Sequence, residues 1–150
     1  MQTQFKLLNN TRGHFIKLAQ GLTIDQLNTI PTHCTNNIAW NLGHILASQS
    51  GLCYRLAGLP TLTDKDTWST FKIGTKPERL YTQAEIDSII KQLQTSALQM
   101  EEDYNNGVFK TYTPYVAAGF ELNTIEDAII YNNIHEAYHY GVASAIKKLV

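Results

Sequence analysis

Two histidines near the end of the chain, His135 and His139, carry the clearest chemical signal in the sequence. Side chains four residues apart on an α-helix lie on one face, one turn apart, so their ring nitrogens can converge on one ion. The alternative is that both rings lie in a helical core and bond to neighbouring helices. Because the two rings stack in mid-helix beside Asn132, the metal site is the favoured interpretation.

The segment from His135 to His139 also spells H-E-x-x-H, the motif in which zinc proteases use the glutamate as general base. Such proteases take a third ligand well downstream of the second histidine. Only eleven residues follow His139, and none of them is His, Asp or Glu. Glu136 falls outside the predicted buried stripe, where it is expected to be solvated or to pair with another helix. The sequence therefore argues against a protease and requires a third ligand from upstream.

Three upstream histidines are candidates for that ligand: His14, His33 and His44. His33 lies in a proline-containing connection and is the least constrained. His14 and His44 each lie next to a predicted core position, and a helix packed between two neighbours buries a wide arc. Spacing alone leaves both His14 and His44 open.

Four predicted helices must position these side chains, because apolar residues recur at helical spacing in four stretches. Small residues, caps and prolines mark their ends. The helices cover roughly 2–20 up to Gly21, from Asn36 or Asn37 to 58–60, from the capping box 82–85 to 105–107, and from Thr124 onward.

The fourth helix has a stripe that is apolar at both ends and polar in its middle. Burying polar groups there costs on the order of a few kcal/mol unless partners satisfy them. Asn132, and Asn41 on the second helix, are predicted to orient ligands or substrate, or else to bond backbone groups in the core. Counted in steps of three and four, the stripe is Ile125, Ala128, Asn132, His135, His139, Val142, Ile146 and Leu149.

Two longer connections separate these helices. Residues 57–81 hold Trp68 and Phe71, and a connection of that length is usually functional or packed on itself. The segment 112–115, with Phe109 and Phe120, is expected either to wall a pocket over the metal or to cap the bundle. No alternating strand pattern is present, so we predict an all-α bundle in one domain spanning residues 1–150.

Composition and charge exclude several classes of function. Thirteen acidic and twelve basic residues give a formal net charge of −1. No region concentrates Lys and Arg, so neither nucleic acid nor an anionic membrane is an expected partner. The chain lacks an apolar run of membrane-spanning length and an apolar signal core. Cys34 and Cys53 form no disulfide framework or zinc-knuckle pattern, which indicates free thiols in a reducing cytoplasm.

Two motifs and a loop resemble those of a known family. Trp40-Asn-Leu-Gly-His44 and His135-Glu-Ala-Tyr-His-Tyr-Gly141 are similar to motifs of the DinB/YfiT-like superfamily of metalloenzymes, and the loop with Trp68, Phe71 and Gly74-Thr-Lys-Pro77 resembles its DinB-like subset. The resemblance implies an up-down four-helix bundle with a long connection between its second and third helices, commonly a homodimer. It also implies a divalent metal ion, usually nickel or zinc, held by His44, His135 and His139.

Three neutral histidines without a carboxylate leave a position at the metal for water or substrate. Some members of the superfamily are transferases or isomerases that use low-molecular-weight thiols, and a thiol bound to a metal loses its proton. By analogy, we expect a small cytoplasmic metal-dependent enzyme with a small-molecule substrate, and a thiol-dependent S-transferase is the sharpest hypothesis. The alternative is a non-catalytic bundle whose polar stripe or metal site serves stability or dimerisation. No residue is assigned a catalytic role.

Overall fold

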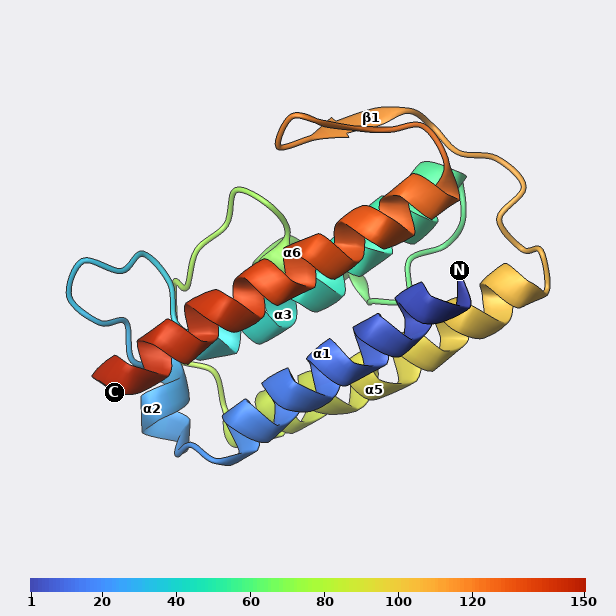
Figure 1. The fold of residues 1–150 in the computed structure, drawn as a ribbon. Coiled ribbons are helices and arrows are strands. Elements are labelled where there is room, and N and C mark those ends of the chain that lie inside the picture. The colour runs from blue at the N-terminus through green and yellow to red at the C-terminus, as the bar shows by residue number, and fades with distance from the viewer.

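The computed structural model describes all 150 residues as an all-α fold with one small hairpin. Four long helices lie side by side (Figure 1): α1 (Gln2–Gln20), α3 (Ile38–Gln49), α5 (Gln83–Asn105) and α6 (Ile125–Ile146). None of the helices combines the length and apolar character that crossing a bilayer requires. The connecting elements are α2 (Ile24–Asn28), a π-helical turn η1 (Ser50–Tyr54), a 3-10 turn η2 (Arg55–Ala57), α4 (Lys65–Phe71), the strands β1 (Tyr115–Ala117) and β2 (Phe120–Leu122), and a final 3-10 turn η3 (Lys147–Leu149).

Side-chain caps confirm the predicted starts of three long helices. Thr82 and Glu85 form a capping box before α5, in which each side chain accepts a hydrogen bond from the other residue's backbone N–H. Thr124 and Asp127 do the same for α6, and Asn37 caps α3. These bonds satisfy N–H groups that have no partner inside the helix.

Contacts between helices fix their directions as up, down, down, up. Residue numbers of paired side chains rise together where helices are parallel, and run in opposite senses where they are antiparallel. By this criterion α1 is antiparallel to α5 and parallel to α6, whereas α3 is parallel to α5 and antiparallel to α6. The long connection carries the chain back along the bundle, so α3 and α5 run in the same direction instead of alternating as in the expected up-down bundle. Gln2–Glu101 and Arg12–Leu93 join α1 to α5, and Gln4–Asn133 and Arg12–Glu136 join α1 to α6. Gln49–Ser96 and Tyr54–Asp103 join α3 and the turn η1 after it to α5, and Asn41–His139 and His44–His135 join α3 to α6.

A polar network crosses the bundle between two apolar clusters. On each long helix its polar side chains fall between the residues of the two clusters; on α1, for example, Arg12 lies between Leu8 and Phe15. The Arg12 guanidinium, on a side chain that is 2% exposed, donates to both carboxylate oxygens of Glu136 at 2.6 and 2.9 Å. We call this set the arginine network: Arg12, Gln49, the Leu93 carbonyl, Ser96, Asn132 and Glu136.

The buried face of α6 is shifted from the predicted stripe. It contains Ile129, Glu136 and Ala143, whereas His135 and Val142 are only partly buried and Leu149 is exposed. From Ile125 the buried residues follow steps of four and then three, whereas the prediction began with a step of three. The sequence does not separate the two alternatives, because the neighbours Ala128 and Ile129 are both apolar. The expectation that Glu136 is solvated is wrong, because its carboxylate pairs with Arg12 inside the bundle. The other expectation, that Glu136 pairs with another helix, is confirmed.

Two elements inside the connections were not predicted. The expectation that no strand is present is wrong, because β1 and β2 pair antiparallel around Ala118 and Gly119. Both loop residues have positive φ, 48° and 85°, as a two-residue hairpin turn of type I′ requires. Strands of three residues are too short to display an alternating pattern. The connection after α3 packs on itself through α4, which Asp64 caps.

Candidate metal centre and adjoining cavity

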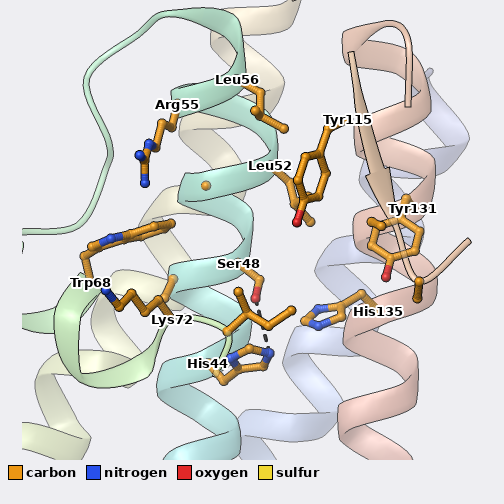
Figure 2. A pocket seen from close by; sticks show the side chains of 15 residues that line it. His44, Ser48, Leu52, Arg55, Leu56, Trp68, Lys72, Tyr115, Tyr131 and His135 are labelled. Atoms are coloured by element: carbon orange, nitrogen blue, oxygen red, sulfur yellow. Dashed lines mark hydrogen bonds between the residues drawn. The ribbon is translucent and has the colours of Figure 1, made fainter. Parts of the chain in front are cut away.

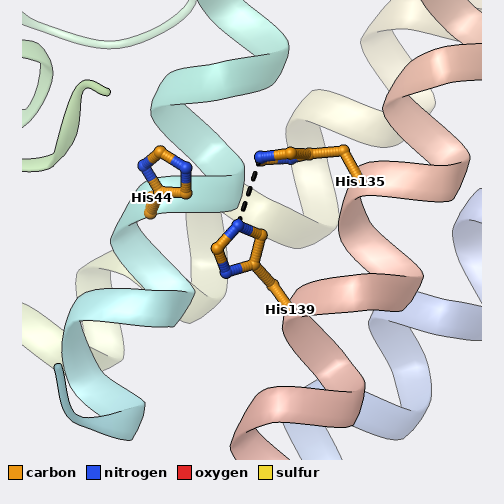
Figure 3. A group of neighbouring side chains, drawn as sticks. All are labelled: His44, His135 and His139. Atoms are coloured by element: carbon orange, nitrogen blue, oxygen red, sulfur yellow. Dashed lines mark hydrogen bonds between the residues drawn. The ribbon is translucent and has the colours of Figure 1, made fainter. Parts of the chain in front are cut away.

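Three histidines from two helices meet inside the bundle. His44 comes from α3, and His135 and His139 come from α6 (Figure 3). One ring nitrogen of each lies within 4.8 Å of those of the other two, so the three could hold a metal ion. We call these residues the histidine cluster.

A backbone carbonyl orients the ring of His44. Nδ1 of His44 lies 2.7 Å from the carbonyl oxygen of Phe71, at the end of α4. Because a carbonyl oxygen only accepts, Nδ1 carries the proton and Nε2 keeps its lone pair. The indole of Trp40 stacks on a face of the ring, with centroids 4.4 Å apart and an interplanar angle of 12°.

An asparagine orients the ring of His139 in the same way. Nδ1 of His139 lies 2.7 Å from Oδ1 of Asn41. The amide of Asn41 cannot be reversed without loss, because its nitrogen donates to the carbonyl of Asn37 at 2.7 Å and to Asn36 at 3.1 Å. His139 therefore also carries its proton on Nδ1 and presents the Nε2 lone pair to the cluster.

His135 completes the cluster from one turn earlier on α6. Its Nε2 lies 3.2 Å from Nε2 of His139, and its buried Nδ1 has no hydrogen-bond partner. Two nitrogens bound to one tetrahedral zinc ion at about 2.0–2.1 Å are separated by about 3.3 Å. The spacing of these two nitrogens therefore fits a shared ion.

Burial keeps all three rings neutral at physiological pH. Desolvation, followed by the charges of the neighbouring rings, lowers the pKa of His139 to about 3 and that of His135 to about 4. Burial also lowers the pKa of His44, against the opposing effect of its bond to the Phe71 carbonyl. Neutral imidazole is the form that binds metals, so protons do not compete for these nitrogens near pH 7.

A cavity of about 400 Å³ opens beside the cluster, and His44 and His135 form part of its wall. Its volume suits a small molecule. Figure 2 shows that its walls come from α3 and the turns after it, α4 with the residue that follows, the hairpin and α6. The side chains labelled there are His44, Ser48, Leu52, Arg55, Leu56, Trp68, Lys72, Tyr115, Tyr131 and His135.

Two glycines let α4 lie directly against α3 and the turn η1 that follows it. A Cβ on Gly43 would stand 2.4 Å from the ring of Phe71, and one on Gly51 would stand 2.7 Å from the ring of Trp68. Real Cβ atoms do not approach this closely, so larger residues at these positions would displace α4. The glycines thereby bring the Phe71 carbonyl to His44 and Trp68 to the cavity.

Comparison with known proteins agrees with this architecture. The family model described as the DinB superfamily matches residues 7–143. The chain belongs to the DinB superfamily. Among solved structures, this member of the superfamily is similar to a conserved protein of a locus from Enterococcus faecalis, with a TM-score of 0.68 and 13% identity over 99% of this chain and 95% of the other. At that identity the likeness shows the fold alone. No curated protein matches the sequence.

Of the upstream histidines left open by spacing, the DinB-superfamily chain brings His44 to the pair on α6. His14 is exposed and packs beside Tyr140, with ring centroids 6.2 Å apart, and His33 is exposed in the connection before α3. Asn41 contacts the cluster through His139 and also bonds the backbone of Asn37. Asn132 does not contact the cluster: its amide donates to Glu136 at 2.8 Å, and its carbonyl oxygen has no partner.

Glu136 is held away from the histidine cluster. Its carboxylate accepts two hydrogen bonds from Arg12 and one from Asn132, so it is engaged inside the arginine network. This geometry agrees with the argument against an H-E-x-x-H protease. Sequence reasoning missed Arg12 because a single charged residue in an apolar stripe gives no sign of its partner, and missed the Phe71 carbonyl because backbone groups have no sequence signature.

Proposed function

We propose that the chain is a small metal-dependent enzyme in which His44, His135 and His139 hold a divalent ion, nickel or zinc. The observation that carries this proposal is the convergence of three neutral imidazoles at the wall of a cavity of about 400 Å³. Asn41 and the Phe71 carbonyl fix two of the rings, and the cavity admits a small molecule beside them. With three protein ligands, such an ion would supply Lewis-acid activation of a nucleophile.

The reaction we propose is thiol-dependent S-transfer, which the resemblance to thiol-using members of the superfamily supports. The sulfur of a low-molecular-weight thiol forms a bond to an electrophilic carbon, the leaving group departs with the electron pair of the broken bond, and the thiol proton is released. The chain's own residues would bind and orient the reactants and limit access of water. A non-catalytic bundle is disfavoured because a purely structural site needs no cavity next to it.

Metal binding is tested first, with protein purified without a histidine tag. After treatment with a chelator, nickel or zinc is titrated by calorimetry into wild type, His139→Ala and the matched control His14→Ala, which removes an exposed histidine outside the cluster. We expect His139→Ala to weaken binding about 100-fold or more, because one of three ligands is lost. No binding by wild type, or equal binding by His139→Ala, overturns the proposal.

Activity is tested by incubating metal-loaded protein with low-molecular-weight thiols and an aryl chloride, and measuring the thioether product. We expect product formation above the uncatalysed rate with the loaded wild type and not with loaded His139→Ala. If the loaded protein binds metal but turns over no thiol in such a screen, the S-transfer assignment fails while the metal site stands.

We also propose that the protein works as a cytoplasmic homodimer. Ile130, Ile134 and Tyr138 recur every four residues on α6 and are 42%, 51% and 66% exposed. With Val116 and Phe120 of the hairpin, they supply apolar surface for a second copy. Light scattering is expected to give twice the chain mass for wild type and the chain mass for Ile134→Lys; a monomeric wild type contradicts the dimer.

A further inference from the structure

The cavity beside the histidine cluster has a charge character unlike that of the whole chain. The chain has thirteen acidic and twelve basic residues, yet none of the fifteen residues that line the cavity is Asp or Glu. Two of them, Arg55 and Lys72, are cationic. The two ion pairs of the protein use Arg12 and Arg79, so neither cavity cation has a carboxylate partner. The cavity therefore offers unneutralised positive charge.

The guanidinium of Arg55 is placed by an aromatic ring rather than by an acid. It lies over the indole of Trp68, 5.5 Å from the ring centroid. That indole in turn packs against the backbone of Gly51. Because Gly51 precedes Arg55 by four residues, the Arg55 side chain points toward the N-terminal end of its helical segment. Gly51 follows His44 by seven residues, about two turns or roughly 10 Å along the helix. Stacking on Trp68 leaves the edge of the guanidinium free to donate hydrogen bonds.

Lys72 stands on the same wall, nearer to the histidine cluster. It directly follows Phe71, whose carbonyl accepts the hydrogen bond of His44 at 2.7 Å. Figure 2 shows Lys72 and Arg55 on the side of the cavity that also holds Trp68, while Tyr115 and Tyr131 lie opposite. Both cations therefore lie on one side of the cavity: the Arg55 guanidinium rests on Trp68, and the Lys72 backbone adjoins Phe71, while both side chains remain exposed to solvent.

The rest of the cavity is mainly apolar. Nine of its fifteen lining residues are hydrophobic, including Leu52, Leu56 and Ala47. An apolar lining favours an apolar ligand body, because its burial contributes roughly 25 cal/mol per Å². A ligand bearing a positive charge would meet two cations and no acid. The lining therefore selects for molecules that combine an apolar part with a negative charge.

We propose that the cavity binds a small molecule with an apolar body and a carboxylate or phosphate-like oxyanion, the oxyanion being held by Arg55 and Lys72 and the other end lying at the histidine cluster. This names the substrate class of the proposed enzyme and so rests on the proposed function, although binding of the oxyanion itself requires no metal. The guanidinium fork matches the two oxygens of such a group, and its hydrogen bonds to an anion are charge-assisted.

The test compares two probes with the same aromatic body, one charged and one neutral. Anilinonaphthalene sulfonate carries an oxyanion, and phenylnaphthylamine lacks it. Each is titrated by fluorescence into full-length, metal-free protein with chelator present. The variants are wild type, the double variant Arg55→Gln/Lys72→Gln, and the control Lys17→Gln, which removes an exposed cation of α1 outside the cavity.

We expect wild type to prefer the sulfonate, and the double variant to lose roughly tenfold of its affinity for it, since both cations are partly solvated. Affinity for the neutral probe is expected to stay within about twofold, and Lys17→Gln to match wild type. The inference is overturned if wild type does not bind the sulfonate, if the double variant binds it as well as Lys17→Gln does, or if both probes are weakened equally. Chelator keeps the protein free of metal in this test. If the cavity selects the anionic probe but the separate titration detects no metal binding, the proposed enzyme is contradicted while the oxyanion site stands.

Discussion

Two hydrogen-bond acceptors determine which nitrogen of a histidine faces the cluster. The Phe71 carbonyl takes the Nδ1 proton of His44, and Oδ1 of Asn41 takes that of His139. Each bond holds the proton on Nδ1, so that Nε2 is the nitrogen that faces the cluster, and limits rotation of the ring. His135 has no such partner on Nδ1, so its ring is held by packing and by its neighbours in the cluster.

Removing the acceptor from His139 should weaken metal binding without removing a ligand. In Asn41→Ala the ring can rotate or place its proton on Nε2, and we expect affinity for nickel or zinc to fall about 10–100-fold in calorimetry. Asn133→Ala is the matched control, because Asn133 donates two comparable hydrogen bonds to Gln4 but lies outside the cluster. Similar losses in the two variants would show that Asn41 acts through general stability instead.

The sequence predicted the candidate site unevenly, residue by residue. His135 and His139 follow from the spacing of one helix. His44 followed only from resemblance, because periodicity places it beside the core stripe of its own helix. In the structure its side chain is 5% exposed, because α4 lies against α3 and its terminal carbonyl bonds the ring. A contact made by a separate element leaves no trace in local spacing.

Among the elements, α4 decides the shape of the site. It lies on α3 at Gly43 and on the following turn η1 at Gly51, where no side chains project, and from there it supplies the carbonyl for His44 and one wall of the cavity. Because the aromatic rings of α4 pack against these two glycines, this short helix forms part of the site itself.

Gly43→Ala should therefore destabilise the protein although alanine favours helices. Its Cβ would stand 2.4 Å from the Phe71 ring, and we expect the free energy of unfolding to fall by about 1–3 kcal/mol in urea denaturation, with weaker metal binding. Gly141→Ala is the control, because its Cβ meets nothing within 4 Å on α6 and should raise that free energy by about 0.5–1 kcal/mol. Equal effects of the two substitutions would contradict the docking of α4 on glycine.

Sequence patterns predicted the long elements better than the short ones. The start of α5 was predicted from a capping box and that of α6 from a threonine cap with acids in its first turn, and these residues act only on their own helix. The hairpin was missed because its strands have three residues each and its loop contains Ala118 rather than Asn or Asp. The buried face of α6 was misjudged by one step because only contact with Arg12 selects Glu136 over His135 as an interior residue.

For the molecule as a whole, the arginine network joins the four long helices at one level. Arg12 of α1 donates to Gln49 of α3, to Ser96 and the Leu93 carbonyl of α5, and to Glu136 of α6. A charged group buried this deeply tolerates few arrangements of its neighbours, so the network favours one register among the helices.

Removing one member of the central ion pair should cost more than removing both. Arg12→Met leaves the Glu136 carboxylate buried without its partner, and we expect a loss of about 3–5 kcal/mol in unfolding free energy. Arg12→Met/Glu136→Leu removes both charges and should be clearly less destabilised than the sum of the two single variants. A double-mutant cycle in urea measures this coupling, and additive losses would contradict it.

The stability of the metal-free protein should decrease as the solution becomes acidic, because of the histidine cluster. Burial lowers the pKa of His135 to about 4, that of His139 to about 3, and that of His44 below its ordinary value of 6.5. Below about pH 6.5 the unfolded chain therefore binds more protons than the folded one, so protonation favours unfolding. The free energy of unfolding falls by about 1.4 kcal/mol per pH unit for each ring that takes up a proton only on unfolding, until the pH passes the pKa of that ring in the folded state.

Urea midpoints measured with chelator between pH 7 and pH 5 should fall more steeply for wild type than for His135→Leu, which lacks one of these rings. Parallel curves for the two proteins would show that His135 takes up its proton as readily in the folded state as in the unfolded chain.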